Sequence, residues 1–483
     1  MKNFFKIFCL LAAFSVFAVS CDDSDDDSMS ELDLSINYFI WENMNLYYLW
    51  TDNVSALDEK NYSSKEDVEN NLLKKYPDHE EFFNSLLYKK GEVDRFSWIV
   101  DDYEKLEKMF QGITKSMGFD FVLGKIGTTD NVFGLVRYVV KGGPADRAGL
   151  KRGDFFTRID DQQLTVSNYN TLLSNENSYK IGLAEVIDHK ITNLSTSYNL
   201  TAEEVHENPI YLDTIYTIKD KKIGYLVYNG FMSNYDNQLN AVFAKFKQAG
   251  IQDLILDLRY NGGGSLASAK YLASMIYSTD TTLIFNKNSY NADLEKYIIE
   301  KEGKNALNEY FAAKIKASDD TREEAINSLG LKSLYVITTS STASASEILI
   351  NDLKPFIKVT MIGGTTYGKY VGSITIKDYD RNDKLNPNHK WALQPIIMKS
   401  TNKNGVSDFY NGLTPDEKLE EDITNLLPFG NTEELLLKAA IAKINGTSSA
   451  KKAQAPVFST FAERKDLIPH SREMHLNDVF KMK

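Results

Sequence analysis

The second half of this chain alternates short apolar strands with helices, and this alternation constrains the fold more than any other feature. It extends from Ile210 to about Asn445. Strands are predicted at 222–227, 253–258, 333–339 and 358–362, and helices at 237–248, 265–277 and 345–353. Strands separated by helical segments form βαβ units. We therefore expect a largely parallel sheet in this part of the chain.

Two further regions precede the alternating one. The 483 residues are too many for one hydrophobic core, so two or three domains are expected. Aromatic and apolar residues recur at helical spacing within 30–111, which predicts a helical N-terminal domain. From Met117, apolar runs bounded by turn residues predict a small β-rich module over 112–205. The alternating domain is assigned to 206–446, and the polar residues 447–483 to a loose C-terminal tail.

The first twenty residues have the pattern of a signal peptide. Lys2 and Lys6 precede an uncharged run over 7–19 that is too short to span a bilayer. The run ends in Ala-Val-Ser before Cys21, which resembles a bacterial lipoprotein box and would place lipid on Cys21. The alternative is ordinary signal cleavage beside a chance cysteine. The acidic residues 21–29 predict a solvated tether.

The lipoprotein interpretation also predicts a location. We expect an exported lipoprotein of a Gram-negative cell envelope, attached to the outer membrane through Cys21. Acidic runs directly after such a cysteine resemble the surface-export signals of some Gram-negative lipoproteins. Both the periplasmic face and the cell surface therefore stay open.

Charge and residue counts argue against several classes of partner. The formal net charge of −12 argues against nucleic-acid binding, because a basic surface supplies most of the affinity there. Cys9 and Cys21 are the only cysteines, so neither a disulfide framework nor a cysteine zinc site is expected. The six histidines are scattered and do not pair at the spacing of a metalloprotease helix. We expect neither nucleic acid nor a metal as a partner.

A serine-rich segment joins a predicted strand to a predicted helix. Residues 339–347 read Thr-Ser-Ser-Thr-Ala-Ser-Ala-Ser-Glu. One hydroxyl with an acidic residue in the first turn would satisfy a helix N-cap, whereas this segment has six hydroxyls. Backbone N–H groups at a helix start also face an incoming anion, such as the oxyanion of a tetrahedral intermediate. Ser344 is therefore a candidate nucleophile.

Lys369 is the candidate base, because a serine hydroxyl is a weak nucleophile and needs one. It lies 25 residues after Ser344, just beyond the next predicted strand. In a strand–helix–strand unit both residues follow parallel strands, so we expect them at the same carboxyl edge of the sheet. To act as a base, Lys369 must be neutral, which requires burial or a nearby positive potential.

A glycine-rich loop follows another strand that should end at this edge. Residues 257–265 read Asp-Leu-Arg-Tyr-Asn-Gly-Gly-Gly-Ser. Bare glycine N–H groups can bind an oxyanion at close range. Together with the N–H of Ala345 they would form an oxyanion hole with two donors.

Two other interpretations of the glycines stay open. The loop fits the G-x-G-x-x-A pattern of dinucleotide binding, but no clear second strand ends in an acidic residue about twenty residues later. Gly363, Gly368 and Lys369 fit a phosphate-binding loop. Tyr370, however, replaces the hydroxyl that would bind magnesium.

Taken together, these segments resemble the C-terminal processing peptidase family, also called tail-specific proteases. Residues 342–347 are similar to the nucleophile segment of the family, and 367–369 to its base-bearing turn, at the same spacing. Residues 257–264 are similar to its Asp-Leu-Arg-x-Asn-x-Gly-Gly segment. Residues 412–416 and 143–154 resemble its Gly-Ile-x-Pro-Asp segment and part of its PDZ domain. The similarity covers about 117–445.

The resemblance implies a multidomain α/β + β chain. It would have a helical N-terminal domain, a PDZ-like β-rich domain and a ClpP/crotonase-like α/β peptidase domain. It implies a serine-type endopeptidase with a Ser344–Lys369 dyad, an oxyanion hole at Gly263 or its neighbour, and no cofactor. Protein or peptide substrates would be recognised near their C-terminus by the PDZ-like domain through strand addition, with Gly118 and Phe119 in the carboxylate-binding loop.

One position departs from the family. Many members have Gln four residues after the lysine, where it orients the amine, and Ser373 stands there in this chain. Ser373 is shorter but could still make one hydrogen bond. The alternative function is a catalytically inactive, peptide-binding surface lipoprotein, and Ser373 is the sequence feature that favours it. Residues 94–98 look like an element that recurs ahead of the PDZ domain in lipoprotein relatives.

Overall fold

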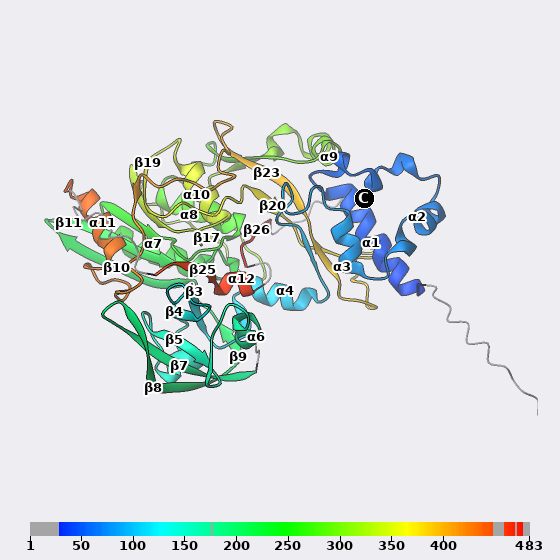
Figure 1. Ribbon diagram of the computed structural model, residues 1–483. Coiled ribbons are helices and arrows are strands. Elements are labelled where there is room, and N and C mark those ends of the chain that lie inside the picture. Colours follow the sequence, from blue (N-terminus) through cyan, green and yellow to red (C-terminus); the bar gives the residue numbers. More distant parts are fainter. Residues whose placement is uncertain (1–28, 175–176, 448–457, 469–470, 477–483) are drawn as a thin grey trace, which may run out of the picture.

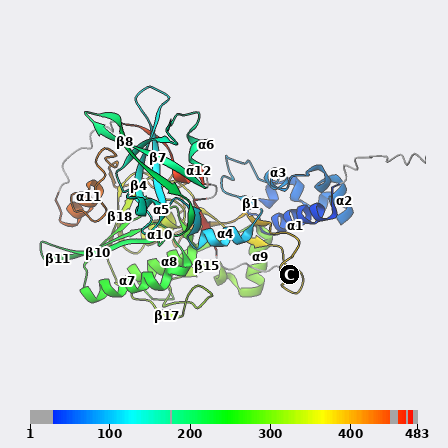
Figure 2. The same ribbon diagram turned by 90° about the horizontal axis from the view of Figure 1, so that it is seen from below.

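The computed structural model describes residues 29–174, 177–447, 458–468 and 471–476. Figure 1 shows the helices of the N-terminal part at one end, an α/β part at the other, and a β-rich module against the α/β part. Figure 2 shows the same three parts after a turn of 90°. The predicted signal peptide, Cys21 and most of the predicted tether lie outside the described residues.

The N-terminal part is helical, as predicted. The first helix, α1 (Glu31–Tyr47), begins at Ser30, whose side chain accepts a hydrogen bond from the Asp33 N–H. Its face with Phe39, Ile40 and Met44 is buried in the main core. The other helices are α2 (Lys65–Asn71), α3 (His79–Ser85) and α4 (Tyr103–Phe110), with 3₁₀ turns at 51–53, 55–57, 59–61 and 73–75.

A short strand connects the helical part to the α/β part. Strand β1 (Trp98–Val100) pairs antiparallel with β22 (Ala392–Gln394), which also pairs with β21 (Ile376–Lys377). The three-residue strand β1 gave no sequence signal. Its pairing nevertheless brings residues 94–98 to the α/β part, where they reach the candidate site described below.

The β-rich module is confirmed, and one strand of its main sheet comes from the far end of the chain. That sheet has the order β25-β3-β4-β5-β7-β8, with β6 on β5, and a separate pair β2·β9 joins the two ends of the module. The bounds are β2 (Ile113–Ser116), β3 (Phe119–Lys125), β4 (Val132–Val139), β5 (Phe155–Ile159), β6 (Gln162–Gln163), β7 (Ser178–Ile187), β8 (Lys190–Thr201), β9 (Glu203–His206) and β25 (Thr460–Glu463), with helices α5 (Pro144–Ala148) and α6 (Tyr169–Leu173).

The α/β part contains the expected parallel sheet. Its strand order is β10-β11-β12-β18-β19-β24, in which every neighbouring pair except β10·β11 is parallel. The bounds are β10 (Ile210–Ile218), β11 (Lys221–Tyr228), β12 (Asp253–Asp257), β18 (Ser333–Thr338), β19 (Lys358–Gly363) and β24 (Glu417–Lys418).

Helices cover both faces of this sheet. Successive side chains of a strand point to opposite faces, so Ile255 packs in a core with α11 (Leu435–Ile444), whereas Leu254 and Leu256 pack in the larger core on the other face. The helices of the α/β part that pack in that larger core are α7 (Asp236–Ala249), α8 (Leu266–Ile276), α9 (Ala292–Glu302) and α10 (Ala345–Leu353). Strands covered on both faces read as continuous apolar runs, which is why the sequence predicted them.

A second sheet lies beside the first and includes part of the predicted tail. Its order is β13-β26-β20-β23-β14-β15. The bounds are β13 (Gly264–Ser265), β14 (Ile284–Ser289), β15 (Asn308–Tyr310), β20 (Val371–Ser373), β23 (Ile396–Asn402) and β26 (Met474–His475), and a separate pair is β16 (Lys314–Ile315) with β17 (Glu324–Ala325).

The expectation of a loose tail over 447–483 is therefore wrong for two segments. Within 458–468, β25 pairs antiparallel with β3 and is followed by α12 (Arg464–Leu467). Within 471–476, β26 pairs with β13 and β20. These strands are too short to show a periodicity, and their partners lie far away in the sequence.

Candidate active site

Three loops meet at the carboxyl edge of the parallel sheet, as expected. Strands β12, β18 and β19 are neighbours, and the glycine-rich loop, the serine-rich segment and the lysine turn follow them. The Ala343 N–H donates to the Asn261 carbonyl at 3.0 Å, and the Tyr367 N–H donates to the Thr342 carbonyl at 2.9 Å. The three loops are thus joined by main-chain hydrogen bonds, which fix their relative positions.

Ser344 has an unusual backbone conformation at the start of helix α10. Its φ is 65° and its ψ is −119°, a region that side chains rarely adopt. Such strain costs about 1–3 kcal/mol and persists where the surroundings impose it. The side chain is fully buried, and its Oγ has no hydrogen-bond partner among the described residues. The Ser344 hydroxyl is thus buried at the start of α10 without a hydrogen-bond partner in the described part of the chain.

Glu347 connects Ser344, the candidate nucleophile, to the lysine turn. Its buried carboxyl group accepts hydrogen bonds from the N–H groups of Ser344 at 2.8 Å, Gly368 at 2.7 Å and Lys369 at 2.9 Å, and from Thr366 Oγ1 at 2.5 Å. Burial raises the pKa of Glu347 to about 7, although these hydrogen bonds oppose the rise. The sequence indicated only an acidic residue in the first turn of a helix and missed this role.

The Lys369 amine is buried, and its hydrogen bonds go to residues of the C-terminal tail. Its Nζ donates to the Arg472 carbonyl and to Glu473 Oε2, each at 3.0 Å, and lies 4.9 Å from the centre of the Phe96 ring. In the described part of the chain no hydrogen bond joins it to Ser344 Oγ. The structure thus brings both predicted catalytic residues to one site and gives the lysine a carboxylate partner from the tail.

Glu473 lies in a pocket with three side-chain donors. Besides Lys369, the Trp98 Nε1–H donates to Oε1 at 3.1 Å, and the single Ser373 hydroxyl proton is shared between the Met474 carbonyl at 3.0 Å and Oε2 at 3.3 Å. The Gln394 Nε2–H in turn donates to Ser373 Oγ at 2.9 Å. Burial raises the pKa of Glu473, although the nearby Lys369 ammonium opposes the rise. Ser373 and Lys369 thus share the Glu473 carboxylate, and an orienting role for Ser373 stays a prediction.

The glycine loop supplies a different donor from the one singled out first. The Gly263 N–H donates to Asn261 Oδ1 at 2.8 Å, whereas the Gly264 N–H donates to the Glu473 carbonyl at 2.5 Å. Ala345 is the first residue of α10, so its N–H has no acceptor within the helix. The geometry therefore offers Gly264 and Ala345 as oxyanion donors, with Gly264 being the neighbour of Gly263.

Gly263 itself is required by close packing. Its φ is 107°, and a Cβ built on it would lie 2.6 Å from the Ser344 Cβ and even nearer to the Glu473 carbonyl oxygen. Any side chain at this position would therefore push the loop away from the nucleophile.

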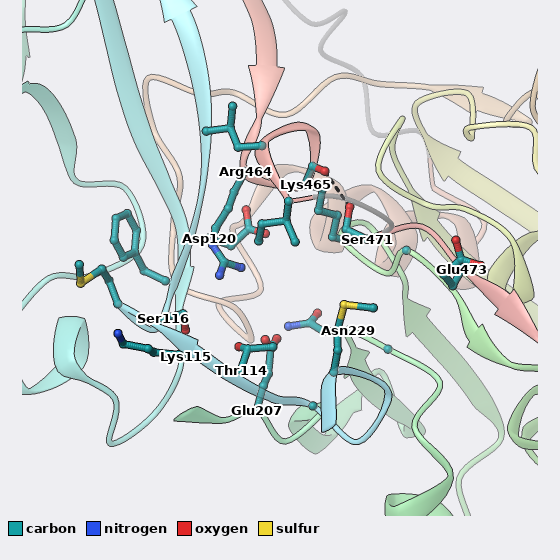
Figure 3. A pocket seen from close by; sticks show the side chains of 18 of the residues that line it. Thr114, Lys115, Ser116, Asp120, Glu207, Asn229, Arg464, Lys465, Ser471 and Glu473 are labelled. Carbon is teal, nitrogen blue, oxygen red and sulfur yellow. Dashed lines mark hydrogen bonds between the residues drawn. The ribbon is translucent and has the colours of Figure 1, made fainter. Parts of the chain in front are cut away.

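A cavity of about 390 Å³ extends from the glycine loop to the β-rich module. Figure 3 shows Glu473 on one side of this cavity and Thr114, Ser116 and Asp120 on the other. Phe119, predicted for the carboxylate-binding loop, lines it. Gly118 lies at the same end of β3, where its N–H donates to Ser116 Oγ at 3.3 Å. The cavity thus connects Phe119 with the glycine-rich loop.

The N-terminal part also contributes to the site. Arg95 Nη2 donates to the Gly368 carbonyl at 2.7 Å, and the Phe96 ring and the Trp98 indole contact Lys369 and Glu473 as described above. The sequence marked 94–98 as a recurring element but assigned these residues no role. Arg95 thus fixes the main chain of the turn that carries Lys369.

Three family models match this chain. The model described as "Peptidase family S41" matches residues 222–419, the model for the S41 N-terminal domain matches 35–98, and a PDZ-domain model matches 135–178. The chain belongs to peptidase family S41. The S41 N-terminal match ends at Trp98, so the loop that contacts Lys369 belongs to the S41 architecture. The helical, PDZ and peptidase organisation predicted from the sequence is confirmed.

Curated relatives and a solved structure agree with this assignment. A probable CtpA-like serine protease of Staphylococcus saprophyticus is 28% identical over 308 residues, which cover 61% of this S41 chain and 53% of the relative. A protein of the same description from Staphylococcus aureus strain COL is 23% identical over 349 residues, covering 68% and 61%. The match to this chain thus spans little more than half of the first relative.

Among solved structures, a crystal structure described as that of an S41 protease from Bacteroides fragilis NCTC 9343 superposes with a TM-score of 0.65 at 25% identity. It covers 84% of this S41 chain and 97% of the other chain. This similarity includes most of the architecture described above.

Membrane-spanning helices and metal sites were sought in the described ranges only. Within them, no helix combines the length and apolar character needed to cross a bilayer. The same ranges contain no group of three or more His, Cys, Asp or Glu side chains placed to hold a metal ion.

Proposed function

We propose that this S41 chain is a serine endopeptidase in which Ser344 is the nucleophile and Lys369 the general base. One observation carries the proposal. The buried carboxyl group of Glu347 accepts hydrogen bonds from the main-chain N–H of both residues, so a single side chain sets their relative position. The strained backbone of Ser344 and its unpartnered Oγ support the same role.

The reaction follows from these positions. A substrate carbonyl oxygen would accept hydrogen bonds from the N–H groups of Gly264 and Ala345. Lys369 Nζ, in its neutral form and released from its present partners, would take the proton of Ser344 Oγ as this oxygen adds to the carbonyl carbon. The resulting ammonium would protonate the leaving amine, and water would hydrolyse the acyl-enzyme.

Protein or peptide substrates are proposed to enter through the PDZ domain. The cavity that joins Phe119 to the glycine loop supports this route, because a chain held along the PDZ sheet could continue toward Ser344. Recognition near the C-terminus of a substrate is part of the proposal. So is attachment to a Gram-negative outer membrane, on its periplasmic face or at the cell surface, through lipid on Cys21; the lipoprotein box before Cys21 supports it.

A second candidate is a catalytically inactive, peptide-binding surface lipoprotein. One observation favours it: Lys369 Nζ binds Glu473 and the Arg472 carbonyl instead of the Ser344 hydroxyl. In this form the base is not available to the nucleophile.

Cleavage of an unfolded protein with an apolar C-terminus distinguishes the two candidates. Ser344→Ala and Lys369→Ala should each lower the rate by at least about 10³-fold, while the exposed matched controls Ser35→Ala and Lys304→Ala should not change it. The assay is run in the wild-type chain and in a Glu473→Ala chain, which frees Lys369 Nζ from its carboxylate partner. If both chains bind the substrate but leave it intact, the peptidase proposal is wrong.

A further inference from the structure

The C-terminal segments of this chain lie where a peptide substrate would be expected. They are β25 with α12 within 458–468, and β26 within 471–476. The first lies on the PDZ domain and the second in the candidate active site. Neither position follows from family membership, because the matched regions end at residue 419.

The first segment extends the PDZ sheet. Strand β25 pairs antiparallel with β3, with Ala462 opposite Leu123 and Glu463 opposite Val122. Strand β3 begins at Phe119, directly after the predicted carboxylate-binding glycine. Addition of a strand to an exposed sheet edge is a general way in which a protein binds an extended peptide. The chain thus adds its own strand next to the loop that was expected to bind substrates.

The second segment places a peptide bond beside the nucleophile. Strand β26 is parallel to β13 and β20 and lies between them. The Glu473 carbonyl accepts a hydrogen bond from the Gly264 N–H at 2.5 Å, and the same carbonyl and the Ser344 Cβ both contact the position that a Gly263 Cβ would occupy. The Glu473 carbonyl therefore occupies the candidate oxyanion donor Gly264 and lies close to the Ser344 side chain.

The side chain of Glu473 binds the amine of Lys369, the proposed base. Its carboxyl group accepts hydrogen bonds from Lys369 and Trp98, and Ser373 Oγ lies 3.3 Å from Oε2 and 3.0 Å from the Met474 carbonyl. The Lys369 amine donates both to this carboxyl group and to the Arg472 carbonyl, so two of its N–H groups are directed to the tail segment. While these contacts persist, Lys369 Nζ is held by the tail segment and makes no hydrogen bond to Ser344 Oγ.

Ion pairs anchor the two segments to each other and to the rest of the protein. Glu463 binds Arg137 of β4 at 2.5 Å and also accepts a hydrogen bond from the Ser341 hydroxyl in the serine-rich segment. Arg472 binds Glu463, and also Asp466 at 2.8 Å. Although burial opposes ionisation, the surrounding cations lower the pKa of Glu463 to about 2, so this anchor is charged at neutral pH.

We propose that the cleft between β13 and β20 binds an extended peptide strand with an acidic side chain, and that its resident ligand is the chain's own segment 471–476. The carboxylate pocket of Lys369, Trp98 and Ser373 selects the acidic residue. An external substrate must displace this segment, so the intact chain works slowly. The effect on catalysis rests on the proposed peptidase function, whereas occupancy of the cleft does not.

Occupancy is tested by tryptic cleavage after Arg472 in a full-length Ser344→Ala chain, where self-cleavage is excluded. Each rate is divided by the rate at which trypsin cleaves a free peptide of residues 466–480 with the same sequence. Relative to the Ser344→Ala chain, the double variant with Glu473→Ala should show at least about a tenfold higher normalised rate. The exposed control Glu300→Ala should leave the rate unchanged. Equal normalised rates with and without Glu473 would overturn the proposal.

Activity is tested separately with Ser344 intact. Glu473→Ala should raise kcat/KM for an external unfolded peptide at least about tenfold, and a blocked Ser-Arg-Glu-Met-His-Leu peptide should inhibit that variant. The same peptide with Gln in place of Glu should inhibit at least about tenfold less. A lower rate for Glu473→Ala would overturn the proposal, because Glu473 would then position the base. A protease-sensitive segment with no cleavage by any variant would instead refute the proposed peptidase function.

Discussion

Two buried carboxyl groups flank Lys369 and differ in almost every respect except burial. Glu347 lies 22 residues before the lysine, in the same strand–helix–strand unit, and binds its main-chain N–H. Glu473 lies 104 residues after it, in a segment outside the matched S41 regions, and binds its side-chain amine. The first fixes where the lysine is, and the second determines whether its amine is available.

The comparison teaches that proximity to a catalytic group does not define a role. Both carboxyl groups have a raised pKa, with burial as the largest cause. Only the direction of their hydrogen bonds, to the main chain or to the reactive amine, separates a group that builds the site from one that occupies it. Variants that weaken the contacts of Glu347 should therefore lower activity, whereas variants that weaken the contacts of Glu473 should raise it.

The largest effect is expected from Glu347→Ala. It leaves three buried N–H groups and the Thr366 hydroxyl without their acceptor, so the free energy of unfolding should fall by about 2–4 kcal/mol. Activity should fall at least about 100-fold, because the nucleophile and the lysine turn lose their common link. Steady-state kinetics and urea unfolding measure both quantities, with Glu300→Ala as the exposed control. An active Glu347→Ala chain would remove the basis of the comparison.

A tenfold loss of kcat is expected from Arg95→Met. This variant keeps the apolar stem but removes the hydrogen bond to the Gly368 carbonyl, so the turn that carries Lys369 becomes less fixed. KM should change little, because Arg95 acts on the turn and not on the substrate. Arg381→Met, at an exposed position, is the matched control. A change confined to KM would place Arg95 in substrate binding instead.

A gain of about two- to fivefold in activity is expected from Trp98→Phe. The ring is kept while the Nε1 donor to Glu473 is lost, so the C-terminal segment is held less tightly and Lys369 is released more often. Trp50→Phe, at a half-buried position, is the control. Reduced activity would show that the indole supports Lys369 itself. The contrast between the Glu347 and Glu473 contacts would then be weaker.

The smallest effect on activity is expected from Asp352→Asn. Asp352 is a buried carboxyl group, like Glu347 and Glu473, but among the described residues it has no hydrogen bond to Ser344 or Lys369. Asp352 in α10 accepts hydrogen bonds from Asn286 and Asn351, and burial raises its pKa to about 8. Because the folded state keeps protons on Asp352 and Glu347 that the unfolded state loses, the free energy of unfolding should fall as pH rises from about 4 to about 8. Asp352→Asn should reduce that slope, measured by urea unfolding at several pH values. An unchanged slope would show that Asp352 is ionised in the folded protein.

The sheet edge with Ser344 and Lys369 could be predicted because its information is local. The apolar runs of β12, β18 and β19 are long enough to recognise, and parallel strands must end at one edge. The tail contacts could not be predicted, since β26 has two residues and Glu473, the residue before it, contacts Trp98 across 375 positions. The choice between Gly263 and Gly264 as oxyanion donor depends on backbone angles that consecutive glycines leave open.

The backbone of Ser344 has a consequence for protein engineering. Its conformation, with φ of 65° and ψ of −119°, is one that glycine adopts without strain. Ser344→Gly should therefore raise the melting temperature by a few degrees while removing the proposed nucleophile. A variant library sorted for thermal stability alone would enrich inactive chains at this position. Any search for a more robust form of this protein must select for turnover at the same time.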